Sequence, residues 1–444
     1  MTTIAAELPR LKGRLPDLIA PSFIEPLMAK LPIVFRVRIL TPVVVVQLLV
    51  LRVLEANTAY AHLPHLANLS FTASSFCQAL ARLPLELLQS VLAAVAAEVD
   101  KNSPAAATRF SGHRVLLADA SCLSMPDTPA LATHYGYAAG QKPGLGFPVA
   151  KLLVLLDLST GLIRRVLIHP YRTHEVSRTR ELHPELKPGD ILVGDRAYAS
   201  YVHLSRLLAQ SFHGLFRLHQ RLSWTLAGTP GERRHHLQAR IVKTFSRHDR
   251  LIVYRKPLTR PVWMSVEEYA AIPGEILVRE LRYGVLEKGF RSREVMLVTT
   301  LLDLKRYPRR ELANLYGLRW RIENQFRHLK STLKMAVLKG KSVAIIEREI
   351  LAYVLAYNLI AREIRQAAAV RDVTPERISF LDAVRWMLAG MKAGALLLIN
   401  PLRPGRIEPR ARKRRMINYP YMTRPREVMK RELFQLSEKL VRLT

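Results

Sequence analysis

The sequence HRVLLAD at 113–119 is an apolar run of strand length that ends in an acid, and DILVGD at 190–195 has the same form. Two more apolar runs, at 149–156 and 162–168, are joined by DLSTG, whose Asp, Ser and Gly are typical of a hairpin turn. Runs of this length that end in polar residues predict β-strands. We therefore expect these segments to form one mixed sheet.

Helical patterns lie between and after these strands. Amphipathic segments at about 176–186 and 200–210 alternate with the strands, which is typical of an α/β fold. Between about 219 and 293, Val and Ile alternate with charged residues, which predicts half-solvated strands. A long helix is expected over 310–334 and further helices over 345–398. The sequence thus predicts an α/β fold with a β-rich insertion.

The chain is too long for one ordinary hydrophobic core, because it has 444 residues. Residues 1–108 contain short helical patterns and fit a helical DNA-binding domain or an ordinary helical bundle. Residues 109–344 contain the α/β domain, with the insertion at 219–293. Residues 345–444 form a helical C-terminal region with a basic tail. We expect three domains with these boundaries.

The charge of the chain is strongly positive. It has 68 Lys and Arg against 36 Asp and Glu, a formal net charge of +32. A protein this basic repels itself unless it meets a polyanion, which favours a nucleic acid as partner. The longest apolar stretch, at 39–54, is interrupted by polar residues, so no membrane span or membrane partner is expected. Two cysteines, Cys77 and Cys122, exclude a disulfide framework and are expected to be buried thiols.

Two acids are candidates for chemistry because of their positions. Asp119 and Asp195 each follow an apolar strand, where side chains leave the core of an α/β sheet and enter a crevice. Two carboxylates in one crevice repel each other unless a cation lies between them. Acids after strands are also common turn residues, and that alternative stays open for each acid alone.

The helix predicted over 310–334 carries a third acid. Tyr316, Arg319, Glu323 and Lys330 fall within an arc of about 60° on a helix with ~100° per residue. Arg327 lies beside them, and a stripe of apolar residues next to this row is expected to face the sheet. The alternative is that the charges form ordinary surface pairs at i and i+4.

These residues carry a resemblance to a known family. The stretch YGLRWRIENQFRHLK at 316–330 resembles the Tyr-(2)-Arg-(3)-Glu-(6)-Lys pattern of bacterial DDE insertion-sequence transposases of the fourth insertion-sequence family. Asp119 in LLADAS and Asp195 in VGDRAY resemble the two Asp segments of that family, and GQKPGLGFPVAKLLVLLDLSTG at 140–161 is also similar. The resemblance covers most of residues 110–390.

The resemblance implies an RNase H-like core and a DNA transposase that cleaves element ends and joins them to a target. It implies that Asp119, Asp195 and Glu323 hold two Mg²⁺ or Mn²⁺ ions, with Asp119 bridging them; three carboxylates suit such hard cations. Arg319 and Lys330 would hold phosphates and Tyr316 would contact the DNA end. Other expected phosphate contacts are Arg196, Arg327, Arg412, Lys413, Arg414 and Arg415.

The expected partner is double-stranded DNA, namely the inverted-repeat ends of the element and the target. Joining two ends needs two active sites, so a homodimer on DNA is expected, in a bacterial cytoplasm and associated with the nucleoid. Two alternatives stay open: a nuclease or resolvase that uses the same acids, and a repressor derived from a transposase that binds DNA without cutting it.

Some details of the expected site stay open. Some relatives have a tryptophan near the strand before the Glu helix and stack it on a flipped base, but this chain has Val295 and Met296 there. Whether a base is flipped, and whether Trp224, Trp263 or Trp320 stacks on it, is not decided by the sequence. The segment RTHE at 172–175 follows a predicted strand and is a further candidate to approach the acids.

Overall fold

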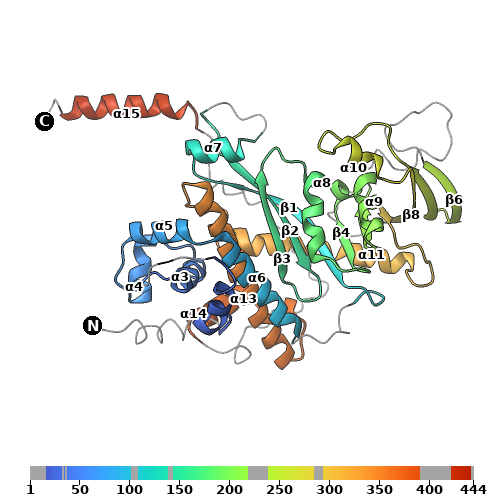
Figure 1. The fold of residues 1–444 in the computed structure, drawn as a ribbon, viewed down its shortest axis with the longest axis horizontal. Coiled ribbons are helices and arrows are strands. Elements are labelled where there is room, and N and C mark those ends of the chain that lie inside the picture. Colours follow the sequence, from blue (N-terminus) through green and yellow to red (C-terminus); the bar gives the residue numbers. More distant parts are fainter. Residues whose placement is uncertain are drawn as a thin grey trace, which may run out of the picture.

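The structure is a computed structural model, and it describes residues 17–32, 35, 38–101, 109–138, 144–218, 239–284, 294–390 and 422–441. Its centre is a single mixed sheet with helices on both faces (Figure 1). Helices of the N-terminal part lie at one end of the molecule, and the last strands of the sheet lie at the other.

The sheet has nine strands, counted over the described residues, in the order β3-β2-β1-β4-β5-β9-β8-β7-β6. The first five in sequence are β1 (Val115–Ser124), β2 (Val149–Asp157), β3 (Ile163–Pro170), β4 (Ile191–Gly194) and β5 (His213–Arg217). β1 is antiparallel to β2 and parallel to β4, which is parallel to β5. This is the mixed, RNase H-like arrangement that was expected, and the α/β prediction is confirmed.

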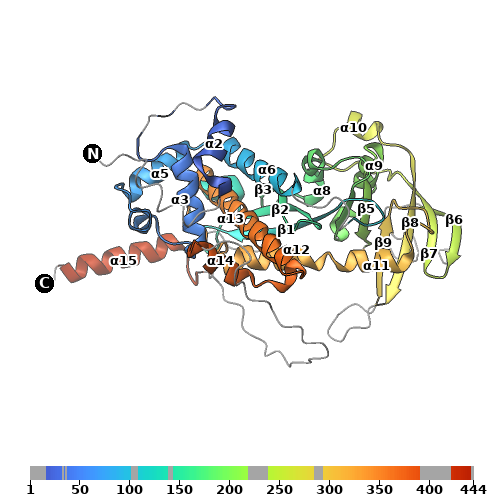
Figure 2. The ribbon, with the colours of Figure 1, turned by 90° about the horizontal axis from the view of Figure 1, so that it is seen from below.

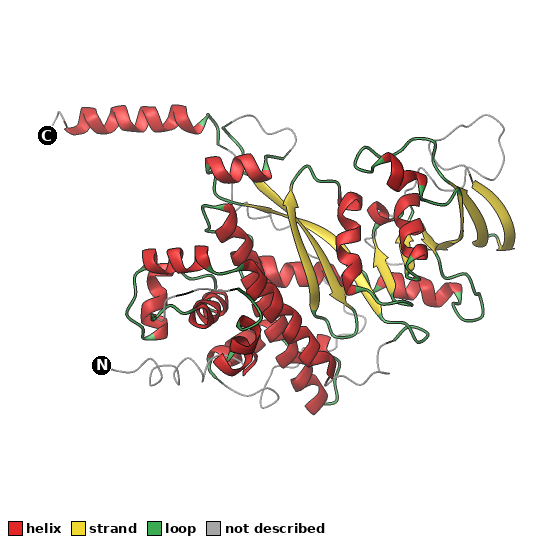
Figure 3. Ribbon diagram, viewed as in Figure 1, coloured by secondary structure: helices red, strands yellow, loops and turns green. Residues whose placement is uncertain are grey.

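The segment predicted as a β-rich insertion contains β6 (Ala239–Ser246), β7 (Asp249–Arg255) and β8 (Glu275–Gly284). These strands form a meander that extends the central sheet, because β8 pairs with β9 (Glu294–Thr299) and β9 pairs with β5. A short helix, α10 (Val266–Ala270), lies between β7 and β8. Figure 3 shows these strands at the end of the sheet away from the N-terminal helices.

Alternation along β1 assigns its side chains to two cores. Val115 and Leu117 belong to the core under the long helices, whereas Leu116 and Ala118 face the other side. That second side is covered by α8 (Glu175–Arg178), η3 (Thr179–Glu185), η4 (Arg196–Tyr198) and α9 (Tyr201–Ala209). Cys122, further along β1, is exposed and Cys77 is partly exposed, so the prediction of two buried thiols is wrong. β1 continues beyond the apolar run, and Cys122 lies in this less buried half.

The first core contains the helices of the N-terminal part. They are η1 (Asp17–Ile19), α2 (Pro21–Met28), α3 (Pro42–Leu54), η2 (Tyr60–His62), α4 (Leu63–Ala67), α5 (Ala73–Arg82) and α6 (Leu85–Lys101). Three of them, α3, α5 and α6, pack on α13 (Val343–Val370), which runs across the molecule (Figure 2). Arg52 of α3 and Glu349 of α13 form a fully buried ion pair of 2.8 Å inside this packing. The helices are therefore joined to α13 by polar as well as apolar contacts.

The remaining helices follow the sheet or connect its parts. They are α7 (Pro129–Tyr135), α11 (Arg309–Gly317), α12 (Trp320–Arg327), η6 (His328–Thr332), η7 (Pro375–Arg377), α14 (Phe380–Leu388) and α15 (Arg426–Val441). Figures 1 and 2 show α15 extending away from the body. The start of α15 is nevertheless held, because Arg426 pairs with Asp127 at 2.6 Å and donates hydrogen bonds to the carbonyls of Gly144 and Gly146.

No single helix in the described ranges combines the length and hydropathy that crossing a membrane requires. The helices α5 and α6 meet that test only when taken together, and they are bent by 78° relative to each other.

Candidate active site

Asp119 lies next to the end of β4. It is the fifth residue of the ten-residue strand β1, so the prediction that it ends its strand is wrong. The strand continues because residues 119–124 still pair with β2. The parallel pairing of β1 with β4, however, ends at Ala118 and Gly194. Asp119 and Asp195 are thus neighbours at the point where the two parallel strands separate. Side chains at such a point leave the core and enter a crevice, as was expected for these two acids.

Asp195 is fixed by the turn that follows β4. Its Oδ1 accepts a hydrogen bond of 2.7 Å from the backbone N–H of Ala197 and caps the short helix η4. Tyr198, at the end of η4, folds back over the strand, and a Cβ at Gly194 would lie 2.7 Å from its ring. The sequence VGDRAY therefore needs a glycine before the acid so that the tyrosine can pack there.

Glu323 is presented by α12, but the long helix predicted over 310–334 is broken. α11 ends at Gly317, α12 begins at Trp320, and a π-helical turn begins at His328. At the break, the N–H groups of Leu318 and Arg319 bond to the carbonyls three residues earlier. Gly317 weakens the helix there, since glycine costs about 1 kcal/mol relative to alanine in a helix. The predicted apolar stripe is largely buried, except Leu318, which is 37% exposed.

Arg319 connects two of the three acids. Its Nη1 lies 3.1 Å from Oδ2 of Asp119, and its Nη2 lies 2.9 Å from Oε1 of Glu323. The Arg319 side chain is 14% exposed, against 17% for Asp119 and 38% for Glu323. The pair with Glu323 is the i,i+4 pair that the helix pattern suggested. The contact with Asp119 spans 200 residues and brings the helix to the sheet.

Asp195 is linked to Asp119 by its effect on the pKa of that carboxyl group. Burial raises the pKa of Asp119 to about 6 from its ordinary value of 3.8. Arg319 and the N–H of Ala120 oppose that shift, whereas the nearby charges of Asp195 and Glu323 add to it. The negative charge at Asp119 is therefore only partly compensated by Arg319, and a further cation would relieve it.

The donor set fits a divalent cation. Carboxylate oxygens are the ligands that Mg²⁺ and Mn²⁺ prefer, and the uncompensated charge at Asp119 favours them. Within the described ranges, no three His, Cys, Asp or Glu side chains are grouped closely enough to share one ion. In this arrangement, Arg319 supplies the positive charge between Asp119 and Glu323.

The other predicted residues have different surroundings. Tyr316 is buried, and burial raises its pKa to about 12. Lys330 lies over β1, where its Nζ donates a hydrogen bond of 2.7 Å to the carbonyl of Cys122. Arg196 and Arg327 are exposed. The basic residues Arg412, Lys413, Arg414 and Arg415 lie outside the described residues, so the structure does not test them.

The candidate tryptophans also differ in position. Trp263 lines a cavity of about 410 Å³ together with Arg196, Tyr201 and Tyr269, between η4 and the segment before α10. Trp320 is 52% exposed at the start of α12. Trp224 lies outside the described residues.

Three residues near the acids were not singled out by the motif. Lys151 of β2 contacts Glu175 at 3.7 Å and bonds to the carbonyl of Thr173 at 2.9 Å. Glu175 interacts electrostatically with Asp195, and Tyr198 with Glu175, Asp119 and Asp195. The segment 172–175 therefore does approach the site. Its position after a strand was the available signal for this segment. Lys151 and Tyr198 lie in the stretches 140–161 and 193–198 that resemble the family, but neither was named there as a site residue.

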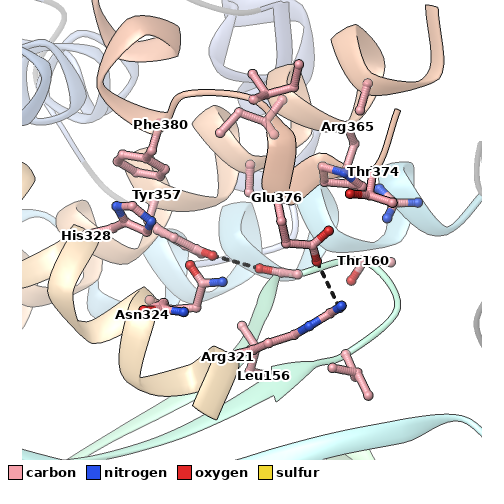
Figure 4. A pocket seen from close by; sticks show the side chains of 18 of the residues that line it. Leu156, Thr160, Arg321, Asn324, His328, Tyr357, Arg365, Thr374, Glu376 and Phe380 are labelled. Carbon is pink, nitrogen blue, oxygen red and sulfur yellow. Dashed lines mark hydrogen bonds and ion pairs between the residues drawn. The ribbon is translucent and has the colours of Figure 1, made fainter. Parts of the chain in front are cut away.

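A cavity of about 520 Å³ lies beside α12 but contains none of the three acids. Figure 4 shows Arg321 and Asn324 of α12 at this cavity, with Arg321 paired to Glu376 at 2.9 Å. At ~100° per residue, Arg321 lies about 160° and Asn324 about 100° around α12 from Glu323. The cavity is lined by Arg327, at the end of α12, but by none of the acids.

Comparisons with known proteins relate this chain to transposases. A family model described as the transposase DDE domain matches residues 110–359. The transposase InsG for insertion sequence element IS4 of Escherichia coli (strain K12) is 25% identical over 315 residues, which cover 67% of this chain and 62% of that protein. The aligned part thus spans less than two thirds of that relative.

A solved structure also aligns with this chain. The cryo-EM structure of the piggyBac transposase synaptic complex with hairpin DNA has a TM-score of 0.42 and 10% identity, over 86% of this chain and 79% of that one. The family model covers more than half of the chain and includes Asp119, Asp195 and Glu323. The chain belongs to the transposase DDE domain family.

Proposed function

We propose that this protein is a DNA transposase whose active site is formed by Asp119, Asp195 and Glu323. The observation that carries the proposal is that Arg319 bonds to both Asp119 of β1 and Glu323 of α12, while Asp195, at the end of β4, acts electrostatically on Asp119. All three lie inside the matched transposase DDE domain, whose members generally use divalent metal ions.

The three acids would hold two Mg²⁺ or Mn²⁺ ions. When bound, such ions lower the pKa of an attacking oxygen and stabilise the charge on the phosphate and the leaving oxygen. The chain's own residues provide the surroundings. Asp195 is held by its bond to Ala197 and Asp119 by its bond to Ala120, so both carboxylates have fixed orientations. Arg319 and Lys330 place positive charge beside Glu323 and β1, where a phosphate would be held.

The proposed substrate is double-stranded DNA, both the element ends and the target. The net charge of +32 favours binding to a polyanion. Arg196 and Arg327 are exposed at the ends of η4 and α12 and would contact phosphates, as would Arg412 to Arg415 in the tail. We further propose that residues 1–108 are the DNA-binding domain, 109–344 the catalytic domain and 345–444 the C-terminal region. The protein would act as a homodimer on DNA in the bacterial cytoplasm.

The test is an assay on paired element ends and a target, with and without Mg²⁺. Joined products with Mg²⁺ support a transposase, nicks alone indicate a nuclease or resolvase, and retarded DNA without cleavage indicates a repressor. The variant Glu323→Gln should lose cleavage and joining by at least about 100-fold and keep DNA binding, because it removes a charge that acts on the reacting groups. Glu311→Gln, an exposed acid on α11, is the matched control. Cleavage at the wild-type rate by Glu323→Gln would contradict the assignment.

A further inference from the structure

A second layer of the protein approaches the acids from the face of the sheet opposite α12. Glu323 and Arg319 come from the side of Val115 and Leu117. The helices α8 and η4 pack together on the other side, where Tyr198 belongs to the core. The acids at the ends of the parallel strands therefore have neighbours from both faces.

Lys151 and Glu175 are the charged residues of this second layer. Lys151 holds the segment that precedes α8, through Thr173 and through Glu175 itself. The Glu175 side chain is 24% exposed, and burial raises its pKa, an effect that Lys151 opposes and Asp195 increases. Glu175 is thus held within the electrostatic range of Asp195 by a contact with β2, and it does not simply extend into solvent.

Tyr198 provides an independent observation. Its side chain is 0% exposed, and its hydroxyl has no hydrogen-bond partner among the described residues. A buried hydroxyl without a partner costs about 1–3 kcal/mol. The charges that act on this hydroxyl are those of Glu175, Asp119, Asp195 and Arg319. The hydroxyl therefore lies within electrostatic range of these charges, on the last residue of the short helix η4 that Asp195 caps.

The packing of the Tyr198 ring depends on the residue at position 194. Only a glycine at 194 leaves room for the Tyr198 ring, which also lies against His203 and Phe216. A phenylalanine would fill the same space without burying a polar atom. The hydroxyl is thus the part of Tyr198 that packing alone does not explain.

We propose that Glu175 is a fourth acid of the active site and that Tyr198 is the buried hydrogen-bond donor of this site. The two residues would position the ligands of the divalent ions from the face of the sheet opposite α12. This inference rests on the proposed function. Residues that orient metal ligands from behind typically change metal affinity or activity by roughly 10- to 100-fold. Both residues are positioning residues, and no bond is made or broken on either of them.

The experiment measures Mn²⁺ binding to the full-length protein by calorimetry, together with single-turnover cleavage of end DNA. Glu175→Gln and Tyr198→Phe should each weaken Mn²⁺ binding by roughly 10- to 100-fold, without changing DNA affinity measured in EDTA. Glu181→Gln is the matched acid control, because Glu181 pairs with Arg178 and His169. Tyr135→Phe is the matched hydroxyl control, since Tyr135 also has a buried hydroxyl without a partner among the described residues. Both controls should behave as wild type.

A double variant tests whether the two residues act together. If Tyr198 supports Glu175, the variant with both changes should lose little more than Glu175→Gln alone. Wild-type Mn²⁺ affinity in both single variants, or losses that simply add, would overturn the proposal. If Tyr198→Phe does not fold, Lys151→Gln tests the restraint on Glu175 from the other side and should also weaken Mn²⁺ binding.

Asp119→Asn separates this inference from the proposed function. Loss of Mn²⁺ binding in Asp119→Asn, with normal binding in Glu175→Gln and Tyr198→Phe, would refute only the fourth acid. Normal binding in Asp119→Asn would refute the metal site itself.

Discussion

Replacing Asp119 by asparagine should stabilise the protein in the absence of divalent ions. The carboxylate has a pKa of about 6 in the folded chain, against an ordinary value of 3.8. At ~1.4 kcal/mol per pH unit, this difference means that the ionised form costs about 3 kcal/mol of folding free energy at pH 8. Asparagine has nearly the shape of the protonated acid and removes that cost. The variant should therefore be inactive and more stable.

The stability difference between Asp119→Asn and wild type should depend on pH. A carboxyl group whose pKa is raised by folding lowers stability above pH 6, where both states are ionised. This cost decreases as the pH falls from about 6 to about 4 and is absent below 3.8, where the acid is protonated in both states. The advantage of Asp119→Asn over wild type should follow the same course.

The assay is urea denaturation of both proteins in EDTA at pH 8, 6 and 4. A second series adds Mg²⁺ at pH 8, which should stabilise wild type and leave Asp119→Asn unchanged, because an ion bound only to the folded protein adds to its stability. Asp195→Asn is a useful comparison at the neighbouring position. Equal stabilities of wild type and Asp119→Asn at pH 8, or an advantage that grows as the pH falls, would refute the reasoning.

Three further predictions concern the rest of the chain. Glu349→Ala should destabilise the protein by about 3–5 kcal/mol in urea denaturation, because it leaves Arg52 buried without its ion partner. Glu427→Ala, in an exposed pair with Lys430, should have a much smaller effect, and equal effects of the two variants would contradict this. Replacing Arg412, Lys413, Arg414 and Arg415 by glutamine should lower the slope of log affinity against log salt by up to about 0.9 per lost phosphate contact, whereas an unchanged slope would mean that the tail does not contact DNA. Light scattering should give a monomer at moderate salt and a dimer only with element ends, since two chains of +32 repel each other; a stable dimer without DNA would contradict the argument from charge.

Much of the fold could be predicted because local patterns determine it. The apolar runs before Asp119 and Asp195 are strands that lie side by side, and the hairpin at 157–161 joins β2 to β3. Leu351, Leu355 and Leu359 of α13 recur every four residues, a spacing that predicts one apolar face of a helix, and all three are buried in the chain's own core.

The break between α11 and α12 could not be predicted from periodicity. Leu318, Arg319, Arg321 and Ile322 each bond to the third preceding carbonyl, which tightens the chain by a fraction of a turn, so the apolar residues on either side still follow a helical repeat. Gly317 was the only local sign, and a single glycine is tolerated in many helices. As a result, Arg319 lies at the start of α12, whereas the sequence predicted it in the middle of one long helix.

Which residues meet in the site depends on contacts between segments that are far apart in the sequence, and no local sequence pattern predicts these contacts. The pair of Arg319 with Glu323 follows from a spacing of four residues, but its contact with Asp119 requires the register of β1 against β4 and the packing of α12 on β1. In the same way, Lys151 and Glu175 meet because β2 is paired to β3, and the chain turns back after β3. A motif search finds residues that share one element. Here the acids lie at the junction of the two faces of the sheet, so the residues from the second face, Glu175 and Tyr198, become candidates only when both cores are known.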